Sequence, residues 1–229
     1  MMNIGSAFMN NHNAFSIRFW DKLAAKYARK PVPDEAIYEQ KIQITQEFLD
    51  TDDEVFEFGC GTGSTALRHA PKVKQLLATD ISPAMIGIAK QQAEASGTNN
   101  VSFATGEVGD FKLESCSKDA VLGLNIMHLL PSPTVALHEV HRILRNDGIF
   151  VSSTPLLKNE PLFVRWILRI MQALGRAPYI SLLNKDEYLK QVTDAGFAVV
   201  RAWMPTKTSI FLIVRKAEVH TCCEKNKAS

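Results

Sequence analysis

The chain has 229 residues, of which 46% are hydrophobic and 22% are charged, so it is long enough to bury one well-formed core. Its net charge of +2 is too small to hold a phosphate backbone, which disfavours nucleic acid as a partner. No run of about 18 apolar residues occurs, and the start lacks the basic and apolar regions of a secretion signal. These features favour a cytoplasmic protein.

The four cysteines are Cys60, Cys116, Cys222 and Cys223. Their spacing matches neither a zinc site nor a disulfide framework, which fits a reducing compartment. A vicinal pair in a polar tail predicts no metal site by itself. We therefore expect no bound metal.

Helical spacing of apolar residues predicts two N-terminal helices within residues 14–50, separated by the "PVPD" break. Short apolar segments bounded by turn residues then predict strands, and each of the first two is followed by a helix. The second of these helices has Ser82 as its N-cap and Pro83 at its first position. The predicted strands are 54–58, 74–80, 101–105, 119–125 and 148–154.

Strands that alternate with helices at this spacing predict a mostly parallel sheet with helices on both faces, which is a doubly wound, Rossmann-like α/β fold. Near the end, "KDEYLKQVTDAG" predicts a helix, and "FAVVRAWM" and "SIFLIVRK" predict a hairpin that gives the sheet an antiparallel edge. We expect a single domain over residues 1–215, followed by a polar tail at 216–229.

The stretch "EFGCGTGSTA", residues 57–66, places three glycines directly after the first predicted strand. In an open parallel sheet this turn is the usual ligand site, and glycines let the backbone approach a ligand closely. Asp80 ends the second predicted strand, where a carboxylate can accept hydrogen bonds from both ribose hydroxyls. The glycine turn and the acid together predict an adenosine-containing cofactor.

Two details separate this turn from the dinucleotide-binding pattern. Ser64 stands where that pattern has its third glycine, and Glu57 stands where an apolar strand residue is usual. An acid beside the turn would repel a pyrophosphate but can balance the ammonium group of an amino acid. A nicotinamide-dependent dehydrogenase is therefore disfavoured, and the methionine end of S-adenosylmethionine fits better.

The sequence resembles the class I S-adenosylmethionine-dependent methyltransferases, in particular the type 11 and UbiE-like small-molecule group. The resemblance is carried by "VFEFGCGTG", "LLATDIS", "TGEVGDF", "DAVLGLNIMHLL" and "LHEVHRILRNDGIFVSSTP", and it extends over nearly the whole chain. It implies a seven-stranded sheet whose last strand is reversed.

The resemblance also implies a cofactor site. The turn from Glu57 to Gly63 would hold the methionine part, Asp80 the ribose, and Asn125 would lie beneath the sulfonium. The turn contributes Glu57, Gly59, Cys60, Gly61 and Gly63, and the adenine would meet Ile81, Met85, Glu107 and Val108. Similar enzymes often have Asp in place of Glu107, which favours a backbone contact from Val108 instead. Tyr27 either closes over the cofactor or packs with its aromatic neighbours into the core.

Methyl transfer needs no universal catalytic residue, because the cofactor already carries an activated methyl group. His128 follows the fourth predicted strand, so it is either a general base or substrate contact, or simply a loop histidine. The corresponding segment reads "NIMH" and lacks the [DN]-P-P-[FY] motif of enzymes that methylate amino groups in nucleic acid.

Residues 155–184 form an insertion before the next predicted helix. Its helical spacing predicts one apolar stripe, with Arg165, Arg169 and Arg176 off the stripe. The stripe contains Leu162, Phe163, Trp166, Ile167, Ile170, Met171 and Leu174. The insertion is a lid over the acceptor pocket, a helix packed on the domain, or a weak contact with a membrane surface.

The sequence thus predicts an enzyme that transfers a methyl group from S-adenosylmethionine to a small, partly apolar acceptor. The alternatives are a non-catalytic S-adenosylmethionine-binding module and, less favoured, the nicotinamide-dependent dehydrogenase. The acceptor atom and the oligomeric state are left open.

Overall fold

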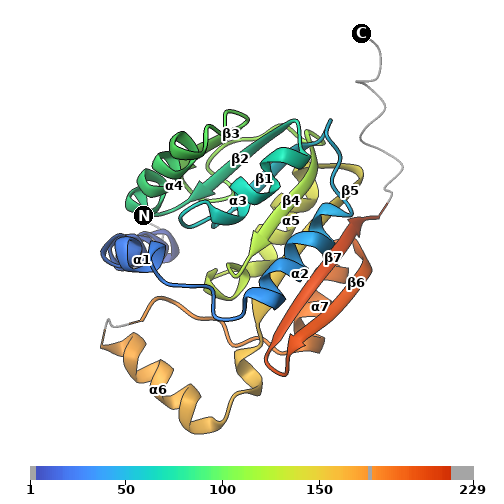
Figure 1. Cartoon of the computed structure of the whole chain (residues 1–229). Helices are drawn as coiled ribbons and strands as arrows, with labels where there is room; N and C mark the ends of the chain where they lie inside the picture. The colour runs from blue at the N-terminus through green and yellow to red at the C-terminus, as the bar shows by residue number, and fades with distance from the viewer. Residues whose placement is uncertain (1–3, 175–176, 218–229) are drawn as a thin grey trace.

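One sheet of seven strands forms the centre of the protein (Figure 1). The structure is a computed structural model that describes residues 4–174 and 177–217. The strands lie in the order β3-β2-β1-β4-β5-β7-β6. Their bounds are β1 Glu54–Phe58, β2 Gln75–Asp80, β3 Val101–Thr105, β4 Lys118–Leu124, β5 Leu144–Pro155, β6 Phe197–Thr206 and β7 Ser209–Lys216.

Helices cover both faces of this sheet, which gives three layers (Figure 1). On one face, side chains of α5 and α7 pack on β1, β4 and β5, and on the other face α2, α3 and α4 do so. The α-helices are α1 Ile4–Ala28, α2 Glu35–Gln46, α3 Ser64–His69, α4 Pro83–Ser96, α5 Pro133–Ile143, α6 Leu162–Ala173 and α7 Lys185–Asp194. Short 3-10 turns are η1 Ala70–Lys72, η2 Met127–Leu129 and η3 Leu157–Asn159.

The predicted fold class is confirmed, including the doubly wound, mostly parallel sheet with a reversed C-terminal strand. The chain runs outward from β1 to β3 and then returns to place β4 on the other side of β1. This reversal of winding leaves a crevice at the carboxyl ends of β1 and β4, which is where such folds bind ligands.

The predicted C-terminal hairpin forms one edge of the sheet, and β7 lies between β5 and β6 and is antiparallel to both. Almost all of β7 is buried whereas most of β6 is exposed, so the continuously apolar strand takes the inner place. Strand β5 begins at Leu144 and not at the predicted residue 148, so Asp147, with a φ of +63°, lies within the strand.

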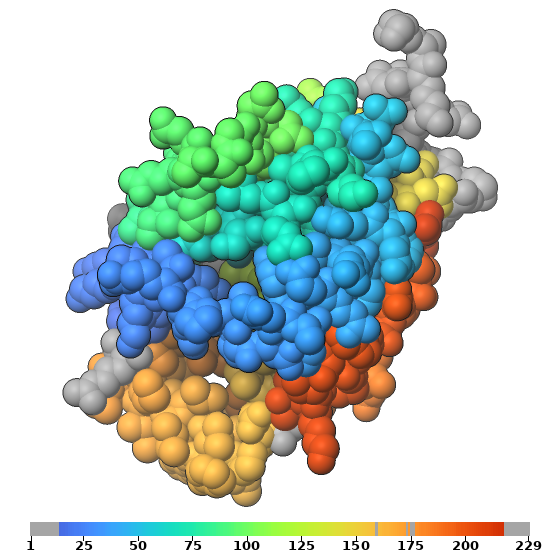
Figure 2. Space-filling model, viewed as in Figure 1, coloured from blue at the N-terminus to red at the C-terminus, as the bar shows by residue number. Residues whose placement is uncertain are grey.

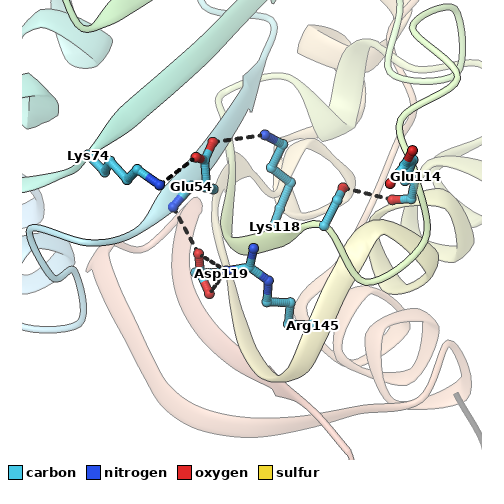
Figure 3. Close-up of polar contacts among 7 residues, drawn as sticks. Glu54, Lys74, Glu114, Lys118, Asp119 and Arg145 are labelled. Atoms are coloured by element: carbon cyan, nitrogen blue, oxygen red, sulfur yellow. Dashed lines mark hydrogen bonds and ion pairs between the residues drawn. The ribbon is translucent and has the colours of Figure 1, made fainter. Parts of the chain in front are cut away.

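Charged residues connect the starts of the strands, at the end of the sheet away from the crevice (Figure 3). Glu54, the first residue of β1, pairs with Lys74 at 3.4 Å and with Lys118 at 3.5 Å. Asp119 accepts a 2.8 Å hydrogen bond from the backbone N–H of Glu54 and pairs with Arg145. This network holds β1, β4 and β5 in register.

Helix α6 stands apart from the layers on the same side as α1 (Figure 1). Its apolar stripe faces outward, and Leu162, Phe163 and Trp166 are 63% exposed or more. The expected alternative of core packing is therefore wrong for this stripe. Within the described ranges, none of the helices is both long enough and apolar enough to cross a membrane.

Candidate functional site

The glycine turn between β1 and α3 depends on its glycines for two different reasons. Gly59, Gly61 and Gly63 have φ values of +68°, +56° and +79°, a region that side chains disfavour. A Cβ atom on Gly59 would lie 2.5 Å from Cγ1 of Ile126, and one on Gly63 would lie 2.7 Å from the Phe103 ring. A Cβ on Gly61 would meet only Tyr27, at 3.8 Å. Gly59 and Gly63 thus let the turn pack, and Gly61 faces the space beneath Tyr27.

Asp80 lies at the carboxyl end of β2, directly beside this turn. Its Oδ2 accepts a 2.9 Å hydrogen bond from the N–H of Gly61, and its Oδ1 accepts one of 2.9 Å from the N–H of Ser82. Burial raises the pKa of Asp80, whereas the two amide donors oppose this shift by favouring the carboxylate. Each carboxylate oxygen keeps a second lone pair, so Asp80 can still accept hydrogen bonds from a ligand.

Glu57 is the most unusual group of the site. Its residue is 2% exposed, and its Oε2 has no hydrogen-bond partner among the described residues. Burial, followed by the nearby charge of Asp80, raises the pKa of Glu57 to about 8. A buried acceptor without a partner is costly, so this carboxyl group is suited to a ligand that brings a donor or a positive charge.

Helix α1 lies over the turn and the start of α4. The Oδ1 atom of Asp21 accepts hydrogen bonds from Ser82 Oγ, at 2.6 Å, and from the N–H of Ala84, at 3.1 Å. Burial raises the pKa of the Tyr27 phenol, and Asp80 raises it further, which places the phenol beside the acid. The sequence reasoning missed Asp21, because a lone acid on a partly apolar helix does not reveal what it will meet.

The residues expected around an adenine differ in accessibility. Ile81 and Val108 are half-buried, whereas Met85 is only 2% exposed and belongs to the packed face of α4. Glu107 is exposed, and its backbone N–H donates a 2.8 Å hydrogen bond to Asp110 Oδ2. The arrangement leaves Ile81 and Val108 more accessible to a ligand than Met85.

Asn125 follows β4 at the crevice and is exposed, with a φ of +57°. Its N–H donates a 2.7 Å hydrogen bond to the carbonyl oxygen of Ser153, and Ser153 Oγ in turn accepts a 2.9 Å hydrogen bond from Lys41 Nζ. Burial lowers the pKa of Lys41. Sequence reasoning also missed Lys41, although its place on the buried side of α2, beside Ile42, was a usable signal.

His128 lies in η2, immediately beyond Asn125. Its Nδ1 is 3.4 Å from Thr154 Oγ1, and its carbonyl oxygen accepts a 2.7 Å hydrogen bond from the N–H of Ser181. Burial lowers the pKa of His128 to about 4, so the imidazole is neutral at pH 7 and is a weaker base than an exposed histidine. The structure therefore places His128 at the same edge of the sheet as Asn125.

Two cysteines can be compared with expectation. Cys60 is a buried free thiol, and burial raises its pKa further, so thiolate chemistry is disfavoured. Cys116 is disulfide-bonded, so the expected lack of disulfides is wrong for this residue. Cys222 and Cys223 lie outside the described residues. Within those residues, no group of three or more His, Cys, Asp or Glu side chains is arranged to hold a metal ion.

Comparison with known proteins agrees with this geometry. Residues 55–148 match the family described as "Methyltransferase domain". An uncharacterized chloroplastic methyltransferase of Arabidopsis thaliana is 28% identical over 187 residues, which covers 78% of this chain and 51% of that protein. Malonyl-acyl-carrier-protein O-methyltransferase of Paenibacillus is 25% identical over 173 residues, which covers 70% of this chain and 61% of that protein.

A solved structure, the SAM-dependent methyltransferase of Aquifex aeolicus, has the same fold, with a TM-score of 0.61 at 17% identity. The likeness covers 77% of this chain and 89% of that one. Residues 55–148 therefore match a methyltransferase domain, and the chain has the fold of a solved S-adenosylmethionine-dependent methyltransferase. The chain spans only 51% and 61% of the lengths of the two curated relatives.

The residues of this site fit S-adenosylmethionine as the cofactor. Glu57 offers a buried acceptor without a partner among the described residues, and Gly61, which donates to Asp80, faces only Tyr27. Figure 2 shows the surface hollowed between α1 and the segments coloured teal, which include the glycine turn. An ammonium group at Glu57 and ribose hydroxyls at Asp80 would satisfy both acids.

The raised pKa of Glu57 predicts that cofactor binding releases protons. Below about pH 8 this carboxyl group is protonated in the free protein, and an ammonium group would favour its ionised form. Binding of S-adenosylhomocysteine at pH 7 should therefore release about one proton, and its affinity should rise as the pH increases from 6 toward 8. Calorimetry in two buffers of different ionisation enthalpy measures the release.

Two controls isolate the effect. The Glu57→Gln variant should bind without proton release, and adenosine, which lacks the ammonium group, should release none from either protein. Binding of S-adenosylhomocysteine to the unmodified chain without proton release would show that Glu57 does not meet the ammonium group.

Proposed function

We propose that the protein transfers a methyl group from S-adenosylmethionine to a small, partly apolar acceptor. The observation that carries this proposal is the pairing of Glu57, buried and without a partner at Oε2, with Asp80 at one glycine turn. The fold and the family support it. One relative is a malonyl-acyl-carrier-protein O-methyltransferase, whose name indicates an organic acceptor rather than nucleic acid.

The cofactor supplies an activated methyl group on a positively charged sulfur, so the reaction is an in-line displacement at carbon. The residues of this chain are proposed to bind, orient and exclude water. Glu57 and the glycine turn would hold the methionine end, and Asp80 the ribose. Asn125 would form the floor beneath the reacting carbon, fixed by its hydrogen bond to Ser153.

The cofactor assignment predicts clear selectivity in binding. Calorimetry should detect S-adenosylmethionine and S-adenosylhomocysteine, with no comparable affinity for NAD. Asp80→Asn should weaken both by at least about tenfold, because each hydrogen bond to a charged group contributes roughly 1.5 to 3 kcal/mol. Equal binding of NAD would rule the assignment out, and thermal melting of the variant checks that it remains folded.

Turnover separates an enzyme from a non-catalytic binding module. Small molecules that copurify with the chain, identified by mass spectrometry, provide the acceptors to test. The expected result is an acceptor that gains one methyl group while an equal amount of S-adenosylhomocysteine forms. Binding of the cofactor with no methylation of any copurified molecule would favour the module.

His128 is proposed as the group that takes the proton of the acceptor, because it lies in η2 beyond the end of β4, at the same edge of the sheet as Asn125. His128→Ala should lower the maximal rate by about 10²-fold or more and leave the affinity for S-adenosylhomocysteine unchanged. The loss should shrink at high pH, where the acceptor ionises unaided. An unchanged rate with the methylated acceptor would show that His128 is an ordinary loop residue.

Residues 155–184 are proposed as a lid over the acceptor. When the site closes, the outward stripe of α6 would move or become covered. The stripe lies on a helix that stands apart from the sheet, and its exposed apolar area is large for an uncovered surface. A closed lid would exclude water and align the acceptor.

The lid predicts a selective kinetic defect. The double variant Phe163→Ala and Trp166→Ala should raise the Michaelis constant for the acceptor or reduce turnover, while S-adenosylhomocysteine affinity changes less than about threefold, or roughly 0.7 kcal/mol. Unchanged kinetics would rule out the lid. If the double variant instead loses binding to lipid vesicles that the unmodified protein retains, the stripe is a membrane contact.

We also propose a cytoplasmic location and no nucleic-acid partner, supported by the small net charge. Localisation of the tagged full chain in its own cells tests this location, and an oxidising compartment would rule it out.

A further inference from the structure

A pocket separates the inner side of α6 from the chain segment that follows it. The cavity has a volume of about 230 Å³, and Arg165, Arg169 and Gln172 of α6 line one side. Tyr179 and Ser181 line the opposite side. Gln172 Nε2 donates a 3.1 Å hydrogen bond to the carbonyl oxygen of Pro178, which fixes the two sides relative to each other.

The charge of this pocket is positive. Two arginines line it, and no Asp or Glu is among its lining residues. Neither Arg165 nor Arg169 forms an ion pair with a residue in the described part of the chain. The Nε atom of Arg165 is buried and lacks a hydrogen-bond partner there. A guanidinium group is suited to carboxylate and phosphate, to which it can donate two parallel hydrogen bonds.

The polarity of α6 is inverted relative to an ordinary surface helix. Its apolar stripe faces outward, whereas Arg165 and Gln172 are half-buried on the inner side. Burying the Nε atom of Arg165 without a partner costs free energy, and packing alone gives no reason to turn this side chain inward. An anionic group in the pocket would supply the missing partner.

The pocket is also connected to the proposed reaction site. Ser181, one of its lining residues, donates its backbone N–H to the carbonyl oxygen of His128 at 2.7 Å. The Lys158 N–H donates a 3.1 Å hydrogen bond to the carbonyl oxygen of Leu183, which anchors the same segment beside η3. The pocket therefore lies next to η2, the turn that carries His128.

We propose that this pocket binds a negatively charged group, a phosphate or a carboxylate, of an acceptor whose apolar part extends toward His128. The inference rests on the proposed function and deepens it by naming the acceptor as an amphipathic anion. A volume of about 230 Å³ is below the roughly 300 Å³ of the smallest sites that enclose a drug-sized ligand. The pocket therefore holds the charged end of the acceptor and not the whole molecule.

The test uses the full chain saturated with S-adenosylhomocysteine, titrated by calorimetry with n-octyl phosphate. Inorganic phosphate and 1-octanol are the matched probes for the charge and the apolar tail alone. Octyl phosphate should bind more tightly than either. Arg165→Gln and Arg169→Gln should each weaken it at least about tenfold, because each removes charged hydrogen bonds, and Arg165→Lys should recover part of the loss.

Arg201→Gln is the control for net charge, because Arg201 lies on β6, away from the pocket, where it pairs with Glu47. This variant should change the affinity for octyl phosphate less than about twofold. Equal affinity of the unmodified chain and both pocket variants for octyl phosphate would overturn the proposal. Thermal melting identifies a variant that does not fold, and Arg169→Gln, at an exposed position, keeps the test valid if Arg165→Gln is unstable.

Phosphatidylglycerol vesicles distinguish a lipid headgroup from a soluble acceptor. If the chain binds octyl phosphate but does not cosediment with the vesicles, the acceptor is soluble, as proposed. If the chain cosediments with the vesicles in a way that depends on Arg165 but does not bind octyl phosphate, the proposal is overturned. The titration needs no turnover. Failure to bind S-adenosylhomocysteine would therefore contradict the proposed function alone, and loss of octyl phosphate binding would contradict only this inference.

Discussion

The hydrogen bonds of one carboxylate hold the candidate site together. Asp80 accepts the N–H of Gly61 with one oxygen and the N–H of Ser82 with the other, so a single side chain joins the glycine turn, β2 and the start of α4. Asp21 adds α1 to the same point through Ser82. Gly59, Gly61 and Gly63 give the turn its positive φ values, and the contacts of Asp80 hold it against β2 and α4.

This arrangement places two acids close together in a buried setting, which has an energetic cost. The charge of Asp80 and the burial of Glu57 both raise the pKa of Glu57 to about 8. Asp80 is compensated by amide donors, but Oε2 of Glu57 has no partner within the described chain. The cost is understandable in a binding site, since a cationic ligand recovers it on binding. The same reasoning applies to Arg165 in α6, because its buried Nε also has no hydrogen-bond partner among the described residues.

The site and the charged network lie at opposite ends of the sheet, and this separation has a physical basis. Glu54, Lys118 and Asp119 begin their strands and hold the register, whereas Asp80, Asn125 and Ser153 lie where strands end. In a parallel sheet only the carboxyl ends open into the crevice where the winding reverses. Stability and ligand binding can therefore be altered independently in this protein.

The sequence alone determined three features, because each follows from a local pattern. Alternating strands and helices gave the doubly wound α/β fold, three glycines after the first strand gave the ligand-binding turn, and the spacing placed Asp80 at the end of the second strand. It also predicted the apolar stripe of α6 from helical spacing. The outward direction of that stripe, the partners of Asp21 and Lys41, and the inner place of β7 were decided only by the tertiary structure. Those features depend on contacts between residues far apart in the chain, and a periodic pattern shows which residues share a face but not what that face meets.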